Sequence, residues 1–286
     1  MEDPNRNLPL IVGFLSDLMF AVRIEAVAER LNYQVRWIER ADQVAPPDPT
    51  TPPRQLAEHL IGPGAVLLDQ LTRWRPALLI FDLSSPEIPW REWVALIKSV
   101  PATRRLPVIC FGSHVDVETM QAAKNAGADA VLARARFSAD LPDLIEKYAS
   151  IPDYAAIEAA CQASLSALAL KGLEEFNLGE YFEAHEYLEE AWNEDQSAGR
   201  ELYRAILQVA VAYLQIERGN YGGALKMFLR LRQWIEPLPA LCRGVHVARL
   251  RQDADRVHQA LLGLGAQRIG EFDRRLLRPV QYRRPE

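Results

Sequence analysis

This sequence of 286 residues has no long hydrophobic run, no excess of basic residues and few cysteines. No apolar segment approaches the roughly eighteen residues that a membrane-spanning helix needs. The N-terminal stretch MEDPNRNLPL carries acidic residues where a signal peptide would carry basic ones, so we expect no signal peptide. The formal net charge is −5, whereas phosphate binding needs a basic surface. We therefore expect neither a nucleic acid nor a membrane among the partners of this protein.

The cysteines are three in number, and Cys110, Cys161 and Cys242 are widely spaced without a C-x-x-C pair. An odd number without such a pair fits a reducing cytoplasm and indicates neither a disulfide framework nor a zinc site. The sequence also lacks a P-loop, a G-x-G-x-x-G motif, a nucleophile elbow and a Ser/Cys–His arrangement. These absences favour a cytoplasmic protein without enzymatic activity. We expect no cofactor, except Mg²⁺ if the first candidate site below is active.

The N-terminal part of the chain, residues 1–150, alternates between short apolar runs and amphipathic stretches. Strand patterns lie at 9–15, 33–39, 77–82, 106–111 and 128–133, and helical patterns at 18–31, 64–73, 89–100, 116–127 and 138–149. Strands that alternate with helices of this length predict βαβ units, hence an α/β fold with five parallel strands and helices on both faces. The proline-rich segment 44–54 is predicted to be an exposed loop.

From about residue 154 the strand patterns stop, and an all-α helical bundle is predicted to follow. Helical patterns cover 154–178, 180–194, 198–218, 221–236 and 245–263. We place the domain boundary at 150–154, around Pro152, the helical domain at 154–265 and a basic tail at 266–286. The motif G-x-Y-x-x-A occurs twice, forty residues apart, in NLGEYFEAH and ERGNYGGAL. It predicts that the chain makes the same helix corner twice.

The first candidate site is Asp82, which ends the third predicted strand and is followed by Pro86. Ligands of parallel sheets of this kind collect at the carboxyl ends of the strands. D-x-x-x-P after an apolar strand, LPVICFG at 106–112 and AGADAVL at 126–132 resemble the receiver domains of response regulators over residues 8–150. This resemblance implies a receiver, or flavodoxin-like, fold. It also implies that Asp82 is the phosphoacceptor and that acids after the first strand hold Mg²⁺.

The other positions of the receiver motif depart from the family pattern. The acid pair falls on Ser16 and Asp17, the hydroxyl position on Gly112 with Ser113 beside it, and the lysine position on Arg134. With one carboxylate fewer, Mg²⁺ would lose much of its attraction. Asp17 is equally suited to cap the helix that follows it, and Arg134 to pair with the phosphoacceptor aspartate. We therefore favour a degenerate receiver-like domain, a pseudo-receiver.

The second candidate site is a polar cluster in the helical domain. His185 shares a helix face with apolar residues, and Glu189 follows it by one turn. Gln208 stands alone in the apolar run of the predicted central helix, and a buried amide needs partners. The predicted cluster consists of His185, Glu189 and Gln208, with Tyr203 or Arg204. It either fixes the helix register or binds a ligand or metal, although two ligands are few for zinc.

Two stretches of the helical domain resemble the small all-helical family known as domain of unknown function 309. The pattern F-N-x-G-x-Y-F-x-x-H-E-x-L-E-x-x-W is matched from Phe176 to Trp192, and L-Q-x-A-x-A follows from Leu207 to Ala212. The resemblance covers about residues 165–240 and implies no reaction, because the family has none assigned. His185, Glu189 and Gln208 are among its motif positions.

Charge is distributed unevenly along the helical domain. Residues 173–195 contain nine acids and no lysine or arginine, whereas the tail segment 274–286 contains five arginines. We expect the tail either to be solvated or to bind an acidic partner or this acidic helix.

Together these features predict a regulatory or scaffold protein. Its receiver-like domain would mediate interaction or dimerisation, and its helical domain would act as effector or bind a protein partner. Two alternatives remain open. One is a functional response regulator phosphorylated on Asp82, and the other is a ligand- or metal-binding bundle centred on His185 and Glu189.

Overall fold

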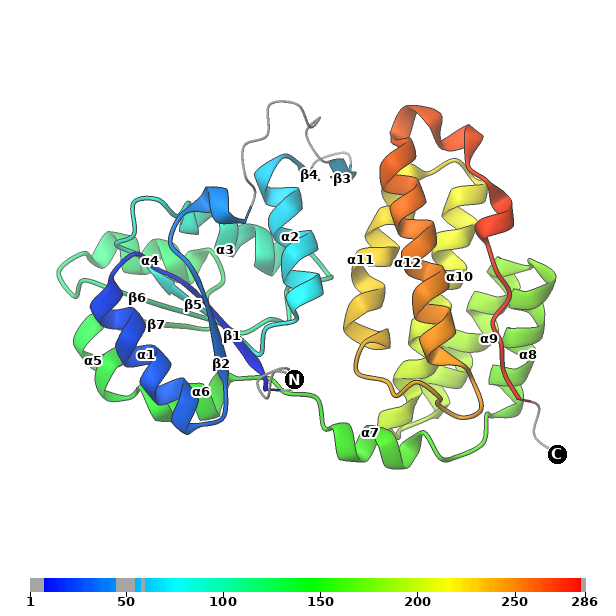
Figure 1. The fold of residues 1–286 in the computed structure, drawn as a ribbon, viewed down its shortest axis with the longest axis horizontal. Helices are drawn as coiled ribbons and strands as arrows, with labels where there is room; N and C mark the ends of the chain where they lie inside the picture. The colour runs from blue at the N-terminus through cyan, green and yellow to red at the C-terminus, as the bar shows by residue number, and fades with distance from the viewer. Residues whose placement is uncertain (1–7, 45–54, 58–59, 284–286) are drawn as a thin grey trace, which may run out of the picture. The chain divides into compact units, whose positions relative to one another are not determined.

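The computed structural model describes residues 8–44, 55–57 and 60–283. The chain divides into two compact units, one of Met1–Gln55 with Leu60–Ile151 and the other of Leu56–His59 with Pro152–Glu286 (Figure 1). Among the described residues, no helix is both long and apolar enough to cross a membrane. The loop predicted for the proline-rich segment falls almost entirely on 45–54, outside the described residues.

The first unit is built on a sheet of five parallel strands in the order β2-β1-β5-β6-β7, as predicted. The strands are β1 (Leu10–Phe14), β2 (Gln34–Ile38), β5 (Leu78–Asp82), β6 (Val108–Gly112) and β7 (Ala130–Ala133). A separate pair, β3 (Gln55–Ala57) and β4 (Leu60–Ile61), forms a two-stranded sheet. The strand order reverses next to β1, which is the arrangement of flavodoxin-like folds and places the ligand-binding edge at the carboxyl ends of β1 and β5.

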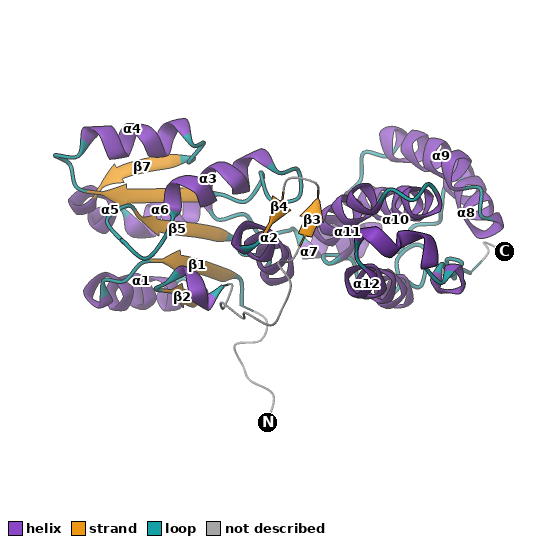
Figure 2. Ribbon diagram, turned by 90° about the horizontal axis from the view of Figure 1, so that it is seen from above, coloured by secondary structure: helices purple, strands orange, loops and turns teal. Residues whose placement is uncertain are grey.

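Helices cover both faces of this sheet (Figure 2). They are α1 (Leu18–Arg30), α2 (Pro63–Trp74), α3 (Trp90–Ser99), α4 (Val117–Asn125), α5 (Arg134–Ala139) and α6 (Leu141–Tyr148), with the 3-10 turn η1 (Ala41–Gln43). Alternate strand residues point to opposite faces, so Leu79 and Phe81 pack with α2 and α3, while Leu78 and Ile80 pack with α1 and α6. Burial on both faces explains why these strands are continuous apolar runs.

The second unit is a bundle of helices around α10 (Glu201–Glu217). Its other elements are α7 (Tyr154–Ala160), α8 (Ala167–Leu178), α9 (Tyr181–Glu194), α11 (Tyr221–Ile235), α12 (Val247–Leu264) and the 3-10 turns η2 (Ala198–Arg200), η3 (Ala266–Glu271) and η4 (Arg274–Leu276). Helix α10 contacts both α9 and α11 and is buried along most of its length. This confirms that the apolar run over 198–218 contains the central helix.

The repeated G-x-Y-x-x-A motif makes the same helix corner twice. Gly179 and Gly219 follow the ends of α8 and α10 with φ of +91° and +71°, a conformation that glycine adopts without strain. The tyrosine two residues later begins the next helix, and the alanine three residues after it is fully buried. The motif is therefore a local solution for turning the chain.

The single helix predicted over 154–178 is wrong, because the chain breaks it after Ala160. Cys161 ends α7 and forms a disulfide with Cys242, and the Ser166 hydroxyl accepts a hydrogen bond from the Ala169 N–H (3.2 Å) to start α8. The expectation of no disulfide is corrected by this bond. Spacing along the sequence could not reveal it, because the two cysteines are 81 residues apart.

Thiol counting tests this disulfide directly. Burial and the nearby Asp129 raise the pKa of the free Cys110 thiol to about 12, so this thiol is inert while the protein is folded. We expect alkylation to modify no cysteine in the native protein, only Cys110 in denaturant without reductant, and all three after reduction. Intact mass measures each stage. Three modified cysteines in denaturant without reductant would show that the bond does not form.

The backbone of the basic tail is bound to the helical unit at Val280 and Arg283, while its described arginines, Arg274, Arg275, Arg278 and Arg283, are exposed to solvent as expected. The Asn177 side chain donates to the Val280 carbonyl (3.0 Å) and accepts from the Val280 N–H (2.7 Å). The Arg283 N–H donates to the Gly244 carbonyl (2.9 Å). The tail reaches a residue of the acidic segment, but it does so through backbone hydrogen bonds rather than arginine charge.

Candidate functional site

The first candidate site lies at the carboxyl edge of the sheet, where Asp82 is the last residue of β5. Asp82 is 2% exposed, and its Oδ1 accepts a hydrogen bond from the Ser84 N–H (2.9 Å). A buried carboxylate needs a partner of opposite charge or several hydrogen bonds. Removing its charge from water costs roughly several kcal/mol of free energy, which these contacts must offset. The partner comes from the chain that follows β7, the edge strand two positions from β5 in the sheet.

The partner is Arg134, the first residue of α5 after β7. Its Nη2 donates to both carboxylate oxygens of Asp82, at 2.9 Å each, and its Nη1 reaches Asp17 Oδ2 at 3.4 Å. The guanidinium also lies 4.9 Å from the ring centre of Phe20 and 5.7 Å from that of Phe111. These contacts fix its plane by ion pairing and cation–π attraction. The ion pair expected between Arg134 and Asp82 is therefore present.

The acid-pair position of the receiver motif has two different functions here. Asp17 Oδ1 accepts from the N–H groups of Met19 (3.0 Å) and Phe20 (3.4 Å) and so caps α1, as expected, while its other oxygen contacts Arg134. Ser16 stands where the second acid would be. Its N–H and hydroxyl both contact the Ser85 hydroxyl, at 3.2 Å and 3.4 Å. This hydroxyl pair brings no negative charge to the site.

These residues do not fit a Mg²⁺ ion. Magnesium in such sites is held mainly by carboxylates and retained water molecules. Here both oxygens of Asp82 already accept hydrogen bonds from Arg134, and the free oxygen of Asp17 faces the same guanidinium. A metal ion would have to displace a fixed positive charge, with a serine in place of one ligand.

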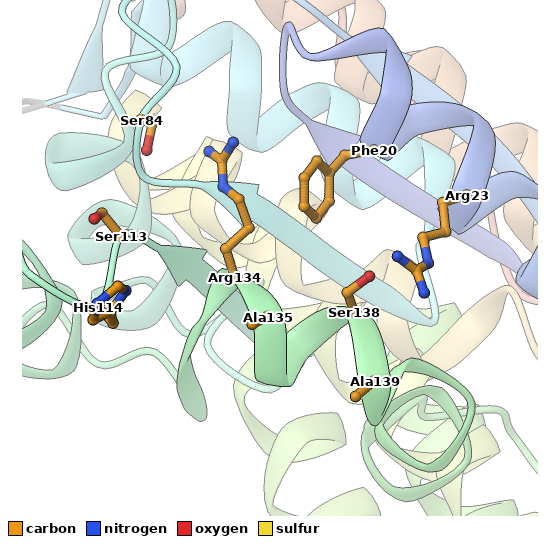
Figure 3. A pocket seen from close by; sticks show the side chains of 9 residues that line it. All are labelled: Phe20, Arg23, Ser84, Ser113, His114, Arg134, Ala135, Ser138 and Ala139. Carbon is orange, nitrogen blue, oxygen red and sulfur yellow. The ribbon is translucent and has the colours of Figure 1, made fainter.

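A cavity of about 810 Å³ opens beside this site (Figure 3). It is lined by Phe20, Arg23, Ser84, Ser113, His114, Arg134, Ala135, Ser138 and Ala139. Ser113, next to the hydroxyl position of the motif, is exposed on the rim of this cavity. Asp17 and Asp82 are not among the lining residues, so the cavity faces the arginine rather than the carboxylates.

The second candidate site lies on the surface of α9 rather than inside the bundle. His185 Nδ1 is 3.0 Å from Glu186 Oε1, and its Nε2 is 4.0 Å from Glu189 Oε2. The side chains of His185, Glu186 and Glu189 are 26%, 59% and 52% exposed. One ligand atom from each lies within 4.8 Å of the other two, a spacing that suits a divalent cation. Sequence reasoning placed Glu186 on the opposite face, but the imidazole reaches its neighbour along the helix surface.

The other predicted members of this cluster have different surroundings. The Tyr203 hydroxyl accepts hydrogen bonds from Arg243 Nη1 and from the Ser166 N–H (3.3 Å). Gln208 is 6% exposed, and its Oε1 is buried without a hydrogen-bond partner among the described residues. Within the described chain, no hydrogen bond joins either residue to His185. The prediction of one buried cluster is therefore corrected to three separate environments.

Arg243 is a buried residue that sequence reasoning missed. Its Nη1 is 2.7 Å from Asp195 Oδ2, its Nη2 donates to Ser197 Oγ (2.7 Å), and its own N–H donates to the Cys161 carbonyl (2.7 Å). Burial raises the pKa of Asp195, but hydrogen bonds from Ser197 and the charge of Arg243 together hold this pKa below its usual value. Arg243 therefore joins α7, the start of α10 and the disulfide into one polar network.

Arg204, the predicted alternative to Tyr203 in the polar cluster, lies on α10. Its guanidinium lies 4.4 Å from the ring centre of Trp192 and 4.0 Å from that of Trp234. Arg200 lies 4.9 Å from Trp192 on the same helix end. Arginine and tryptophan therefore alternate along the junction of α9, α10 and α11, where cation–π attraction fixes the packing.

Comparisons with known proteins separate the two halves of the chain. A family model for a domain of unknown function (DUF309) matches residues 169–227. Among curated proteins, no match is found. The receiver domain of the sensor histidine kinase PA1611 from Pseudomonas aeruginosa PAO1, described with a coordinated magnesium ion, is 16% identical. It covers 49% of this chain and 96% of its own, with a TM-score of 0.37.

Two further solved structures are similar over the same half. A putative response regulator from Chloroflexus aurantiacus is 19% identical over 50% of this chain and 98% of its own, with a TM-score of 0.38. The phosphorylated cyanobacterial phytochrome response regulator RcpA is 14% identical over 51% of this chain and 99% of its own, also with a TM-score of 0.38. The fold itself is assigned from the strand order. The chain thus joins a receiver-like α/β domain to a helical domain that matches the DUF309 family over residues 169–227.

Proposed function

We propose that this protein is a non-enzymatic regulatory or scaffold protein whose receiver-like domain is degenerate. The observation that carries this proposal is the contact of Arg134 with both oxygens of Asp82. Phosphoryl transfer to an aspartate needs a free carboxylate oxygen for the attack and cations that neutralise the phosphoryl group. In this site both oxygens of Asp82 that could attack accept hydrogen bonds from Arg134. Ser16 replaces one of the two acids that would bind the metal. The domain keeps the fold and replaces the chemistry with an internal ion pair.

The proposal predicts that the protein does not accept a phosphoryl group. We expect no mass gain after incubation of the full chain with Mg²⁺ and acetyl phosphate, because Arg134 competes with the metal for Asp82. Intact mass spectrometry measures the outcome, and isothermal titration tests Mg²⁺ binding on the same sample. We expect no saturable Mg²⁺ binding.

Two variants make the assay specific. Asp82→Asn removes the candidate phosphoacceptor, and Asp116→Asn removes an aspartate that caps α4 on the same edge of the sheet. A gain of one phosphoryl group that persists in Asp116→Asn and disappears in Asp82→Asn would contradict the proposal. That result would support the functional response regulator phosphorylated on Asp82.

A protein partner or a second copy of the chain is the proposed ligand of the receiver-like domain. Leu18, Met19 and Val22 of α1 are 69%, 82% and 66% exposed. Exposed apolar residues that gather on one helix are typical of interaction surfaces. The helical domain would then act as the effector. Analytical ultracentrifugation of the wild type and of Met19→Glu distinguishes self-association from binding to another protein.

We also propose the cytoplasm as the location, although disulfides are rare there. The sulfurs of Cys161 and Cys242 belong to residues that are 4% and 0% exposed, which supports resistance of this bond to small thiols. Alkylation of the protein in intact cells, before and after lysis, tests both the cytoplasmic location and the resistance of the disulfide to small thiols.

A metal-binding function of the helical domain is a second candidate. The specific observation in its favour is the convergence of His185, Glu186 and Glu189 on α9. Exposed carboxylates also converge without any ion, so the test is a Zn²⁺ titration of the wild type, His185→Ala and, as a control, His246→Ala.

A further inference from the structure

The cavity beside Arg134 is lined by hydrogen-bond donors and by no acidic residue. The polar members are two arginines, one histidine and three serines, namely Arg23, Arg134, His114, Ser84, Ser113 and Ser138. The two carboxylates of the edge, Asp17 and Asp82, lie behind Arg134 and do not line the cavity. A site of this composition is built for a negatively charged group, whereas the receiver motif that it resembles is built for a cation.

Arg23 and Ser138 are among the donors of this cavity whose side chains have no partner of their own. Arg23 on α1 forms no ion pair or hydrogen bond with any described residue. The Ser138 hydroxyl on α5 is buried and has no hydrogen-bond partner in the described part of the chain. Figure 3 shows the Arg23 guanidinium and the Ser138 hydroxyl pointing toward each other across the cavity. A buried hydroxyl without a partner loses free energy that a bound oxygen atom would restore.

The apolar part of the cavity lies next to these donors. Phe20 stacks on Phe111 with ring centres 5.3 Å apart, and Ala135 and Ala139 of α5 line the wall. Pockets for small molecules combine such an apolar wall with a few placed polar groups, and their volumes run from about 300 to 1,000 Å³. The cavity of about 810 Å³ is within this range. It therefore has room for an organic group attached to the anion.

The charges next to the cavity leave Arg23 as the unused cation. Arg134 faces the carboxylates of Asp17 and Asp82, so this trio carries a net charge of −1 and supplies no free positive charge. Arg136, the next arginine of α5, pairs with Asp140 at 3.2 Å and does not line the cavity. Arg23 and His114 are the remaining ionisable groups that line the cavity. The anion-binding part of the site is thus at Arg23 and Ser138, away from the receiver motif.

We propose that this cavity binds the phosphate group of a phosphorylated small molecule without forming a covalent bond. Arg23 and Ser138 hold the phosphate oxygens, and Phe20 with the two alanines contacts the organic part. Binding joins α1 to α5 at the edge of the sheet. The receiver-like domain is then a ligand sensor rather than a phosphoacceptor, which goes beyond the regulatory role proposed above.

The first test uses inorganic phosphate, at an ionic strength held constant with sodium chloride. In NMR titrations of the full-length wild type we expect saturable shifts confined to α1 and α5. Charge-assisted hydrogen bonds contribute about 1.5–3 kcal/mol, so Arg23→Gln should weaken binding by roughly 10- to 150-fold. Ser138→Ala should weaken it less, and Arg23→Lys should recover part of it. Arg136→Gln is the matched control, because its side chain is 76% exposed and lies outside the cavity, and it should bind as the wild type does.

The second test repeats the titration with phenyl phosphate, which adds a flat apolar group. We expect it to bind several-fold more tightly than inorganic phosphate because its ring contacts Phe20. Equal affinity for the two probes would overturn the small-molecule part of the proposal. An absence of saturable shifts with both probes, or equal loss in Arg23→Gln and Arg136→Gln, would overturn the site. The titrations contain neither Mg²⁺ nor a phosphodonor, so their outcome is independent of whether Asp82 accepts a phosphoryl group.

Discussion

Replacing Arg134 with methionine is expected to lower the free energy of unfolding of the receiver-like domain by about 3–5 kcal/mol. The Asp82 carboxylate is nearly fully buried, and both of its oxygens accept hydrogen bonds from this arginine. Methionine keeps much of the side-chain volume over Phe20 but leaves the carboxylate without its charged partner. The Ser84 N–H remains as its one other donor. An unpaired buried charge is one of the few causes of losses this large.

Urea unfolding, followed by hydrogen exchange of the peptides that cover β5 and β6, measures the free energy of unfolding of the receiver-like domain separately from that of the helical domain. Arg136→Met is the control, because this arginine forms an exposed pair and its loss should change stability by no more than about 0.5 kcal/mol. A double variant, Arg134→Met with Asp82→Leu, should recover most of the loss, since the buried charge is then gone. A loss below about 1 kcal/mol in Arg134→Met would mean that water or another residue satisfies Asp82.

The receiver-like fold could be predicted from the sequence because each of its layers has its own periodicity. Leu78–Asp82 and Val108–Gly112 are apolar at every position, which is typical of parallel strands that are covered on both faces. A helical pattern lies between successive strands, and a connection of this length returns the chain to the same end of the sheet. The strands were therefore predicted to be parallel. The short helix α5 (Arg134–Ala139) was missed, and the helix predicted over 138–149 is α6, which begins only at Leu141, after the turn at Asp140.

The Arg134–Asp82 pair was predicted from motif positions rather than from periodicity. Strand ends of a parallel sheet meet at one edge, so residues 52 apart in the sequence could be placed together. The polar cluster of the helical domain lacked such a rule. Angles on one helix placed His185 beside Glu189, but the depth of that face depends on how α9 rotates against its neighbours. Helical periodicity does not determine this rotation to better than one residue.

The polar network around Arg243 could not be predicted, because its parts come from segments without a regular pattern. Arg243 lies between two helices in the left-handed conformation, with φ of +51°, and Asp195 and Ser197 lie between two others. The Cys161–Cys242 disulfide joins the segment of Arg243 to the end of α7, and the Arg243 side chain then reaches Asp195 and Ser197. Such constraints arise from tertiary contacts, and a single sequence contains no local sign of them.

Arg243→Met is expected to destabilise the helical domain by about 3–5 kcal/mol at neutral pH. The variant removes the cation from the Asp195 carboxylate and one hydrogen-bond donor each from Tyr203 and Ser197. Methionine has the same backbone preference against positive φ as arginine, so the difference reports the side chain alone. Hydrogen exchange of the α10 peptides measures it, and Arg268→Met, which breaks an exposed pair with Glu271, is the control. A loss as small as that of the control would show that the network does not hold the domain together.

The same variant should change how stability depends on pH. The pKa of Asp195 is lowered in the folded protein, because Ser197 and Arg243 outweigh the opposing effect of burial. A carboxyl with a lowered pKa stabilises the fold above its unfolded pKa of about 3.9, and this contribution disappears as the pH falls through the folded value. In Arg243→Met one cause of the lowering is absent, so less stability is available to be lost. The gap between wild type and variant should therefore be constant above about pH 5 and narrow below about pH 4. A gap that does not change between neutral pH and pH 3 would assign the effect of Arg243 to packing, with no contribution from the charge of Asp195.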